Sequence, residues 1–362
     1  MRQTTFLQAF DTKMENMTEY EDYLDYGEYT EAVQCTRDND NKLGALLSIL
    51  YYFMFTFSVI CNGIVLIIIR RFDQLTTVTN ILLLNLVMSS LIFMISLPFM
   101  AVYMQLSNWI FGEVMCKIVS TVYYLGFYSS VLFLALLTFD RYLAIQHPLN
   151  DSQVRNRKYA GISCSVVWLV SGLACIRPMI IYSSFFSSLD NKTFCEEYPR
   201  NLTYVDMDQL RKSGFYLQLT VFFIFPLVVI VYCYSRIAIT VMSFRIAGKF
   251  KTVRLIFIIV LLFFMCWTPF NVVHLMHINN EAVCSCEDEQ KLGYALQITR
   301  TIAYFYFCIS PVFYTFVGKK FQNHFRHLLV KHFPKLKRHL SVSQNSRSYM
   351  YTKTTPNDFR DI

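Results

Sequence analysis

The feature that most constrains this chain is a series of seven long segments with almost no charged side chains. A helix that crosses the hydrocarbon core of a bilayer needs about 20 mostly apolar residues, and each segment is about long enough for one crossing. Charged residues make up only 16% of the chain, against about 25% in typical soluble domains. The sequence therefore predicts an all-α membrane protein, a bundle of seven transmembrane helices within residues 43–317. The segments are 43–69, 74–112, 118–139, 159–176, 213–235, 255–280 and 292–318, and only the last contains a charge, Arg300.

Basic residues between the segments indicate which ends face the cytoplasm. Lysines and arginines follow the first, third and fifth segments, and residues 318–362 contain ten Lys or Arg against two Asp. Residues 1–42 contain ten acidic and four basic residues, so they belong on the opposite side. We expect a multi-pass protein of the plasma membrane with its N-terminus outside the cell. The first span would serve as the insertion signal, because residues 1–13 lack an apolar stretch.

Four regions follow from this topology. Residues 1–42 form an acidic extracellular tail, and residues 43–317 form the helical bundle. Residues 318–333 predict a short amphipathic helix on the anionic inner leaflet, because Phe and Leu share one side and basic residues the other. Residues 334–362 form a cytoplasmic tail rich in Ser and Thr. Its candidate phosphorylation sites are Ser341, Ser343, Ser346, Ser348, Thr352, Thr354 and Thr355.

Cysteines and glycosylation sequons gather on the predicted outer face. The outer face is oxidising, so pairing is expected among the five cysteines that fall there. Cys116 lies at the outer end of the third span and Cys195 in the loop between the fourth and fifth. Cys35, just before the first span, could reach the loop after the sixth, where one of Cys284 and Cys286 would be left over. The sequons begin at Asn16, Asn191 and Asn201.

Several short motifs fall at particular places in these spans. The third span ends in Asp140-Arg141-Tyr142 at the cytoplasmic edge, where a charged pair is costly unless it is functional or solvated. The sixth span contains Cys266-Trp267-Thr268-Pro269, whose proline removes a backbone hydrogen bond and kinks the helix. The other motif residues are Asn62-Gly63, Trp168, Pro226, Tyr234, and Ser310 to Tyr314 with Pro311 between them.

In this order and in these spans the motifs resemble those of the rhodopsin-like G-protein-coupled receptors, over about residues 43–330. A finer resemblance is to the chemokine receptors, nearest the CC type. It rests on Ser96-Leu97-Pro98, Trp109-Ile110-Phe111-Gly112, DRYLAIQH at 140–147, CWTPFN at 266–271 and YTFVGKKF at 314–321. The resemblance implies disulfides between Cys116 and Cys195 and between Cys35 and Cys286.

The resemblance also implies a ligand, since chemokines are small basic proteins that suit an acidic tail. In residues 19–29 tyrosines alternate with carboxylates, a setting typical of tyrosine sulfation, and added negative charge would raise the association rate. The sulfation candidates are Tyr20, Tyr23, Tyr26 and Tyr29. The ligand-pocket positions carried over from the family are Tyr51, Tyr123, Trp267, Phe270 and Arg300.

Arg300 departs most sharply from the family, which usually has an acid there. An arginine in the outer third of a span must face a cavity or a partner, or extend to the outer headgroups. It would repel an ammonium group and attract a carboxylate. Met100 also replaces a usual tryptophan, so we do not expect the family's usual pocket chemistry to transfer.

Signal transfer, by the same resemblance, runs through the kink at Trp267 and Pro269, where the sixth helix swings outward. Arg141, held by Asp140 in the inactive state, would then meet the G protein together with Tyr234 and Tyr314. Tyr142 and Pro311 complete the activation positions. The implied partners are a heterotrimeric G protein of the inhibitory type, arrestin and membrane lipid.

Two serines replace residues that rhodopsin-like receptors use to hold a sodium ion. Ser90 stands in place of the usual acid in the second span, and Ser310 in place of the usual asparagine; both normally act with Ser130. Sodium binding should therefore be weak or absent. The consequence would be either raised basal activity or damped coupling.

Other classes of function fit less well. A scavenging receptor that binds chemokine without signalling is the main alternative; intact Asp140-Arg141-Tyr142 argues against it, and Ser90 and Ser310 argue slightly for it. A transporter or channel would need more convergent polar residues in the spans. No metal cluster, phosphate loop or nucleophile–base pair is apparent, so we expect no enzyme, no cofactor and no nucleic-acid partner.

Overall fold

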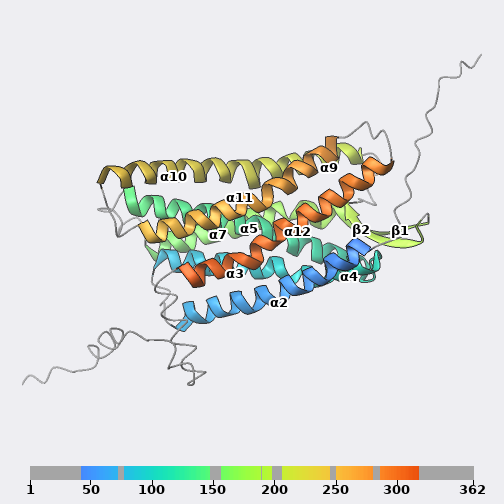
Figure 1. Cartoon of the computed structure of the whole chain (residues 1–362), viewed down its shortest axis with the longest axis horizontal. Coiled ribbons are helices and arrows are strands. Elements are labelled where there is room, and N and C mark those ends of the chain that lie inside the picture. The colour runs from blue at the N-terminus through green and yellow to red at the C-terminus, as the bar shows by residue number, and fades with distance from the viewer. Residues whose placement is uncertain are drawn as a thin grey trace, which may run out of the picture. The chain divides into compact units, whose positions relative to one another are not determined.

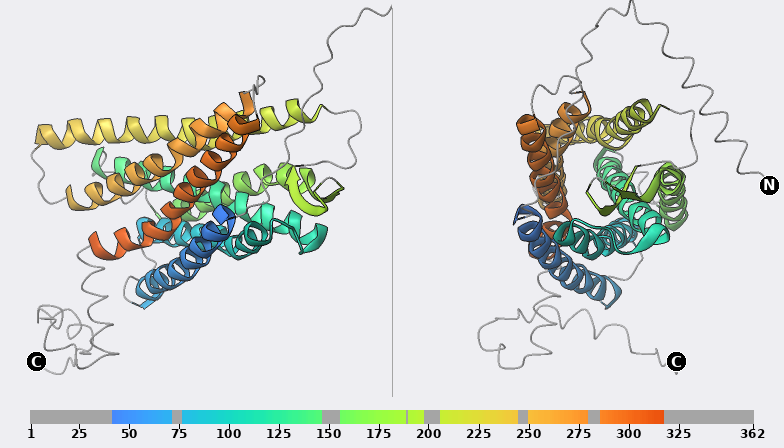
Figure 2. Two further views of the ribbon diagram at one scale, coloured as in Figure 1. Left: turned by 45° about the vertical axis from the view of Figure 1, so that its right-hand side comes forward. Right: turned by 90° about the vertical axis from the view of Figure 1, so that its right-hand side faces the viewer.

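The computed structural model describes residues 42–71, 77–146, 156–188, 190–197, 206–244, 250–279 and 286–317. Nearly all of them are helical, and one short hairpin is the exception. The helices run roughly along a common direction (Figure 1) and surround a central axis when viewed from an end (Figure 2). The seven expected spans are all found. They are α2 (Lys42–Arg71), α3 and α4 (Val78–Ile95 and Leu97–Leu106), α5 (Gly112–Gln146), α7 and α8 (Arg157–Ala174 and Ile176–Ile181), α9, η2 and α10 (Met207–Leu219, Thr220–Ile224 and Phe225–Phe244), α11 (Phe250–Asn279) and α12 (Cys286–Val317).

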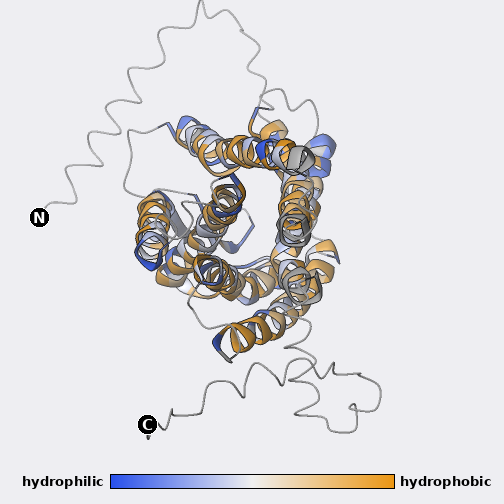
Figure 3. Ribbon diagram, turned by 90° about the vertical axis from the view of Figure 1, so that its left-hand side faces the viewer, coloured by the Kyte–Doolittle hydropathy of each residue, from blue (hydrophilic) through white to orange (hydrophobic). Residues whose placement is uncertain are grey.

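The outer surface of these helices is apolar. Six of the described spans are long and apolar enough to cross a membrane, and α12 packs beside them against α2 and α11. Large side chains such as Leu46, Ile162 and Met265 are each at least 65% exposed. Hydrophobic segments are found on the helices all around the bundle (Figure 3). Side chains of this kind are stable on a surface when lipid covers it, so the fold is a seven-helix membrane bundle.

Prolines lie next to two interruptions of the helices and inside a third helix that is continuous. Pro98 begins α4, and at the junction Ser96 donates from Oγ to the carbonyl of Phe93 at 2.7 Å. Pro226 has no N–H to donate, and the preceding turn, η2, adopts the wider π pattern, in which the Phe225 N–H donates to Thr220. Pro269 lies inside α11, where its missing N–H bends the helix.

Aromatic rings fill the middle of the bundle. Trp267 is completely buried and stacks on Phe127 with 4.2 Å between ring centroids. Phe93 stacks on Phe307 at 4.1 Å, which joins α3 to α12. Gly126 of α5 permits the close approach of α3, because a Cβ there would overlap the backbone of Phe93. These rings belong to the main one of the core clusters formed by the described residues.

A β-hairpin covers part of one end of the bundle and was not anticipated from the sequence. Strand β1 (Tyr182–Ser187) pairs antiparallel with β2 (Lys192–Glu197), and Ser184 lies opposite Cys195. The turn contains Asn191 with φ of 51°, a left-handed conformation that asparagine tolerates better than most residues. The hairpin thus connects the fourth and fifth spans.

Candidate functional site

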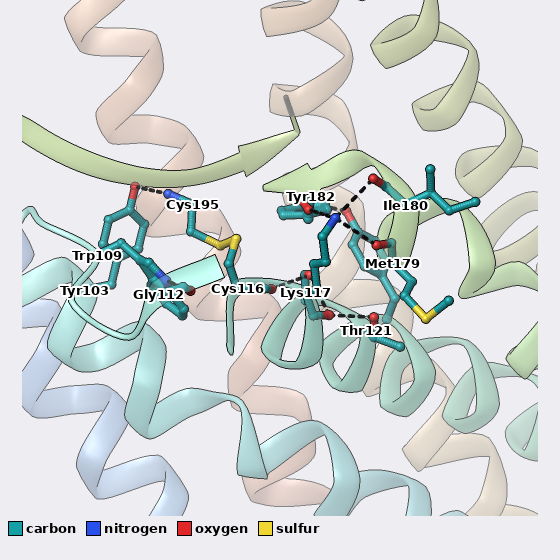
Figure 4. Close-up of a disulfide and its surroundings, with 12 residues drawn as sticks. Tyr103, Trp109, Gly112, Cys116, Lys117, Thr121, Met179, Ile180, Tyr182 and Cys195 are labelled. Carbon is teal, nitrogen blue, oxygen red and sulfur yellow. Dashed lines mark hydrogen bonds between the residues drawn. A yellow bond between two sulfur atoms is a disulfide. The ribbon is translucent and has the colours of Figure 1, made fainter. Parts of the chain in front are cut away.

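The hairpin is held to the bundle by a disulfide and by hydrogen bonds (Figure 4). Cys195 of β2 is bonded to Cys116 at the start of α5, which confirms the predicted pair. Lys117, the next residue of α5, donates from Nζ to the carbonyl of Tyr182 at 2.8 Å and to those of Met179 and Ile180 at 3.3 Å. The Lys117 ammonium group therefore binds the backbone carbonyls where α8 ends and β1 begins.

The loop between the second and third spans also holds the hairpin. The backbone N–H of Trp109 donates to the carbonyl of Thr193 at 2.8 Å, and Asn108 accepts from the Thr193 N–H at 2.8 Å. The Trp109 indole donates to the Gly112 carbonyl at 2.8 Å, which fixes the ring against the disulfide. The motif from Trp109 to Gly112 thus holds this loop against the hairpin and the disulfide.

An ion pair fastens the other side of the hairpin to α9. Arg177 of α8 donates to both carboxylate oxygens of Glu197, at 3.1 and 3.3 Å, and to the carbonyl of Leu210 at 2.9 Å. Gly214 makes room for this guanidinium, because a Cβ there would overlap it. Burial, and then the nearby Glu197 carboxylate, raise the pKa of Tyr182, so this phenol stays neutral.

Arg300 of α12 lies half-buried within a group of aromatic side chains. Its guanidinium carbon is 5.8 Å from the centre of the Phe270 ring. The hydroxyls of Tyr51, Tyr123, Tyr182 and Tyr304 lie within electrostatic range of it. We call Arg300, Phe270 and these four tyrosines the outer cluster.

The structure brings four of the five predicted pocket residues together in the outer cluster. Tyr304 links them, since its ring lies 5.6 Å from both Tyr51 and Tyr123. Trp267 is the exception, because it lies deeper, edge-on to Phe270 at 5.8 Å and packed against Phe127. Tyr304 was missed by sequence reasoning, although it lies one helical turn after Arg300 and thus on the same face of α12.

At the opposite end of the bundle, three residues form a hydrogen-bonded network that joins α3 to α5. The Asp140 carboxylate is completely buried and lies 3.8 Å from the Arg141 guanidinium. Thr79 of α3 donates from Oγ1 to Asp140 at 3.0 Å and accepts a hydrogen bond from Arg141. The expected pairing of Asp140 with Arg141 is present, and Thr79 is a further member that the sequence did not suggest.

Other residues expected at this end lie close by. Gln146 of α5 donates to Thr240 at 2.6 Å and to the Arg236 carbonyl at 3.0 Å, which ties α5 to α10. The ring of Tyr142 packs against Tyr232, also on α10. Tyr234 lies beside Thr138 and Arg141. Pro311 and Tyr314 belong to α12, but their side chains lie outside what the structure describes.

The serines that replace or accompany the usual sodium ligands, Ser90, Ser130 and Ser310, make no hydrogen bond to another helix within the described chain. Ser90 donates to the Leu86 carbonyl of its own helix at 3.0 Å. Ser130 is buried and its hydroxyl has no partner among the described residues. Ser310 is also buried. Asn62 instead bonds Ser58, whose hydroxyl donates to the Phe307 carbonyl at 3.3 Å and thereby links α2 to α12.

Several predicted sites fall outside the described residues. They are the tail tyrosines, Cys35, Asn16, Asn201, the interfacial helix at 318–333 and the cytoplasmic phosphorylation sites. The pairing of Cys35 with Cys286 therefore stays a prediction. Asn191 is described, and it lies exposed at the hairpin turn.

Comparison with known proteins shows the relatives of this chain. Residues 61–314 match the model of the 7 transmembrane receptor (rhodopsin family). The chain is 34% identical to C-C chemokine receptor type 1 of Homo sapiens, over 86% of this chain and 88% of that protein. It is 36% identical to the probable C-C chemokine receptor type 3 of Mus musculus, over 83% of each chain. It is 33% identical to human C-C chemokine receptor type 4, over 80% of this chain and 79% of that protein.

Proposed function

The chain belongs to the rhodopsin family of seven-transmembrane receptors, and within it to the chemokine receptors, and we propose that it binds a chemokine outside the cell and activates a G protein inside. The receptor is a multi-pass membrane protein and not an enzyme. The proposed output is release of cytosolic calcium and directed cell migration through the inhibitory class of G protein.

The observation that carries the signalling half of this proposal is the network of Thr79, Asp140 and Arg141. It holds the Arg141 side chain at the inner end of α5 through one ion pair and one hydrogen bond. Such contacts are weak enough to be exchanged for contacts with a partner protein when the helices shift.

The proposal that the chain binds a chemokine rests on the end of the bundle that carries the hairpin and the outer cluster. The hairpin is fixed by the disulfide, by Lys117 and by Arg177, so it presents a firm surface beside the outer cluster. We propose that the acidic tail, sulfated at Tyr20, Tyr23, Tyr26 and Tyr29, attracts the basic body of the chemokine. The ligand's flexible N-terminal segment would then reach the outer cluster and shift the balance between two helix arrangements.

A calcium assay with a panel of purified chemokines tests the proposal. Cells that express the receptor should release calcium in response to at least one of them, and sensors for each class of G protein α subunit should report the inhibitory class. An Arg141→Asn variant, checked for equal surface expression, should bind the same chemokine without calcium release. Calcium release that persists in this variant would contradict the role given to Arg141.

Scavenging is the second candidate, because Ser90 and Ser310 stand where rhodopsin-like receptors usually have an acid and an asparagine. A scavenger would bind and internalise a labelled chemokine while calcium and all G-protein sensors stay at baseline. The two candidates are therefore separated in the same cells.

Two further parts of the proposal concern the tails. An antibody against residues 1–30 should stain intact cells, as an extracellular N-terminus requires. Replacement of the seven Ser and Thr sites between 341 and 355 by alanine should reduce arrestin recruitment, because phosphates there would supply the negative charge that arrestin binds. Staining only after permeabilisation would contradict the topology.

A further inference from the structure

The positive charge of Arg300 has no carboxylate partner in the described part of the chain. The ion pairs found there join Arg141 to Asp140, Arg177 to Glu197, and Lys291 to Glu287 and Asp288. Glu197, whose charge acts on Tyr182 of the outer cluster, has both of its oxygens taken by Arg177. A cation in a membrane helix is costly unless a partner or a wet cavity compensates it.

The groups that do surround Arg300 are suited to an anion and not to a second cation. Phenols are neutral at pH 7 and can donate a hydrogen bond, and four of them lie within electrostatic range of the guanidinium. The imidazole of His274, which packs 5.3 Å from Phe270, has a buried Nδ1 with no hydrogen-bond partner in the described chain. None of these groups brings a negative charge.

The geometry of Arg300 leaves its donors available. The guanidinium carbon lies 5.8 Å from the Phe270 ring centre, and its N–H groups make no hydrogen bond to the described residues. The side chain is half-buried. A planar guanidinium matches a carboxylate with two parallel hydrogen bonds, whereas an ammonium group would be repelled.

We propose that the outer cluster is an oxyanion subsite, in which Arg300 binds the carboxylate of an acidic side chain in the N-terminal segment of the protein ligand. This inference rests on the proposed function, because it needs a ligand whose N-terminal segment reaches the bundle. It adds the chemistry of that segment: the receptor should bind a ligand with an Asp or Glu near its N-terminus more tightly than one with a basic or amidated residue there. Tyr51 accepts a hydrogen bond from Thr301 at 3.4 Å and keeps its own O–H as a further donor.

A charge-selection experiment tests this preference. The chemokine that binds best in the panel is displayed on yeast with its residues before the first cysteine randomised, and the library is sorted on cells that express full-length receptor. Four receptors are compared at matched surface levels: the wild type, Arg300→Gln, Arg300→Glu, and Arg211→Gln as a control that removes an exposed cation of α9. Arg300→Lys is added to separate charge from the shape of the guanidinium.

Wild type and Arg211→Gln should enrich Asp or Glu in the randomised segment. Arg300→Gln should lose this enrichment and bind the best acidic ligand about 10- to 100-fold more weakly, the effect expected for a lost charge-assisted contact. Arg300→Glu should instead enrich Lys or Arg. Equal enrichment of acids by the wild type and Arg300→Gln would overturn the proposal, as would enrichment of bases by the wild type.

A second measurement keeps the test independent of the chemokine. Purified receptor is unfolded by heat with and without glutarate at millimolar concentration, at constant ionic strength. Glutarate should raise the unfolding temperature of the wild type and of Arg211→Gln but not of Arg300→Gln. An equal response of all three would overturn the subsite, whereas a shift confined to receptors with Arg300, found together with no chemokine binding in the panel, would support the subsite and overturn the proposed function alone.

Discussion

The Thr79 hydroxyl of α3 donates a hydrogen bond of 3.0 Å to the buried carboxylate of Asp140 on α5, and it accepts one from the neighbouring Arg141. The Thr79 hydroxyl thus gives the Asp140 carboxylate a hydrogen-bond donor and also restrains the Arg141 side chain. Because the three residues belong to two helices, any movement of α3 relative to α5 breaks the network. The arrangement of α3 and α5 seen here is therefore stabilised by a contact between helices and not by the Asp-Arg pair alone.

Replacement of Thr79 by valine should raise basal signalling. The variant keeps the shape of the side chain but removes the hydroxyl, and a hydrogen bond of this kind contributes about 1 kcal/mol, which corresponds to about a fivefold shift between two states. Ligand-free G-protein activation, measured at equal surface expression, checks the prediction. Ser165→Ala is the control, because it removes a hydroxyl on the exposed side of α7. Basal activity equal to wild type would contradict the role of Thr79.

The Arg177–Glu197 pair should contribute measurably to stability. Its side chains are 26% and 15% exposed, so solvent screens it only in part, and we expect a coupling energy of about 1 kcal/mol. The measurement is a double-mutant cycle with Arg177→Gln and Glu197→Gln, read as the free energy of unfolding in detergent. The same cycle on Lys291 and Glu287, which are 65% and 77% exposed, should give less than about 0.5 kcal/mol. Similar coupling energies for the two pairs would refute the argument that the less exposed pair contributes more to stability.

Ligand affinity should be insensitive to sodium. Ser90 directs its hydroxyl to the Leu86 carbonyl, and the structure places no carboxylate beside Ser130 among the residues it describes. We expect less than about a twofold change in chemokine affinity when sodium is replaced by a large organic cation at equal ionic strength, because a cation bound without a carboxylate is poorly compensated. The Ser90→Asp variant should gain sodium dependence. Strong dependence in the wild type would show that another site holds the ion.

Asn191 should carry a glycan. It is exposed at the hairpin turn, where an oligosaccharide meets no other part of the described chain. The informative change is Thr193→Val, which destroys the sequon while Asn191 keeps its left-handed conformation and Thr193 keeps its backbone hydrogen bonds to residues 108 and 109. Electrophoresis before and after enzymatic deglycosylation should show the loss of one glycan. Unchanged mobility of the variant would mean that the sequon is unused.

Much of the architecture could be predicted from the sequence. The seven spans follow from uninterrupted apolar length, a requirement that the bilayer imposes on each segment separately. The disulfide between Cys116 and Cys195 was implied by the family resemblance, and the structure confirms it. The gathering of Tyr51, Tyr123, Phe270 and Arg300 at the outer end was also anticipated.

Other features depended on how the helices and the hairpin meet. Thr79 reads as an ordinary polar residue near the start of a span, and only the rotation of α3 against α5 places it beside Asp140. Arg177 and Glu197 are 20 residues apart and find each other because the hairpin folds back over α8. The charge of Arg300 was visible in the sequence, but the absence of a described acid beside it was not. Crossing a membrane is a property of each segment's own composition, whereas the partner of a polar side chain depends on the rotation and register of neighbouring elements, which tertiary packing alone determines.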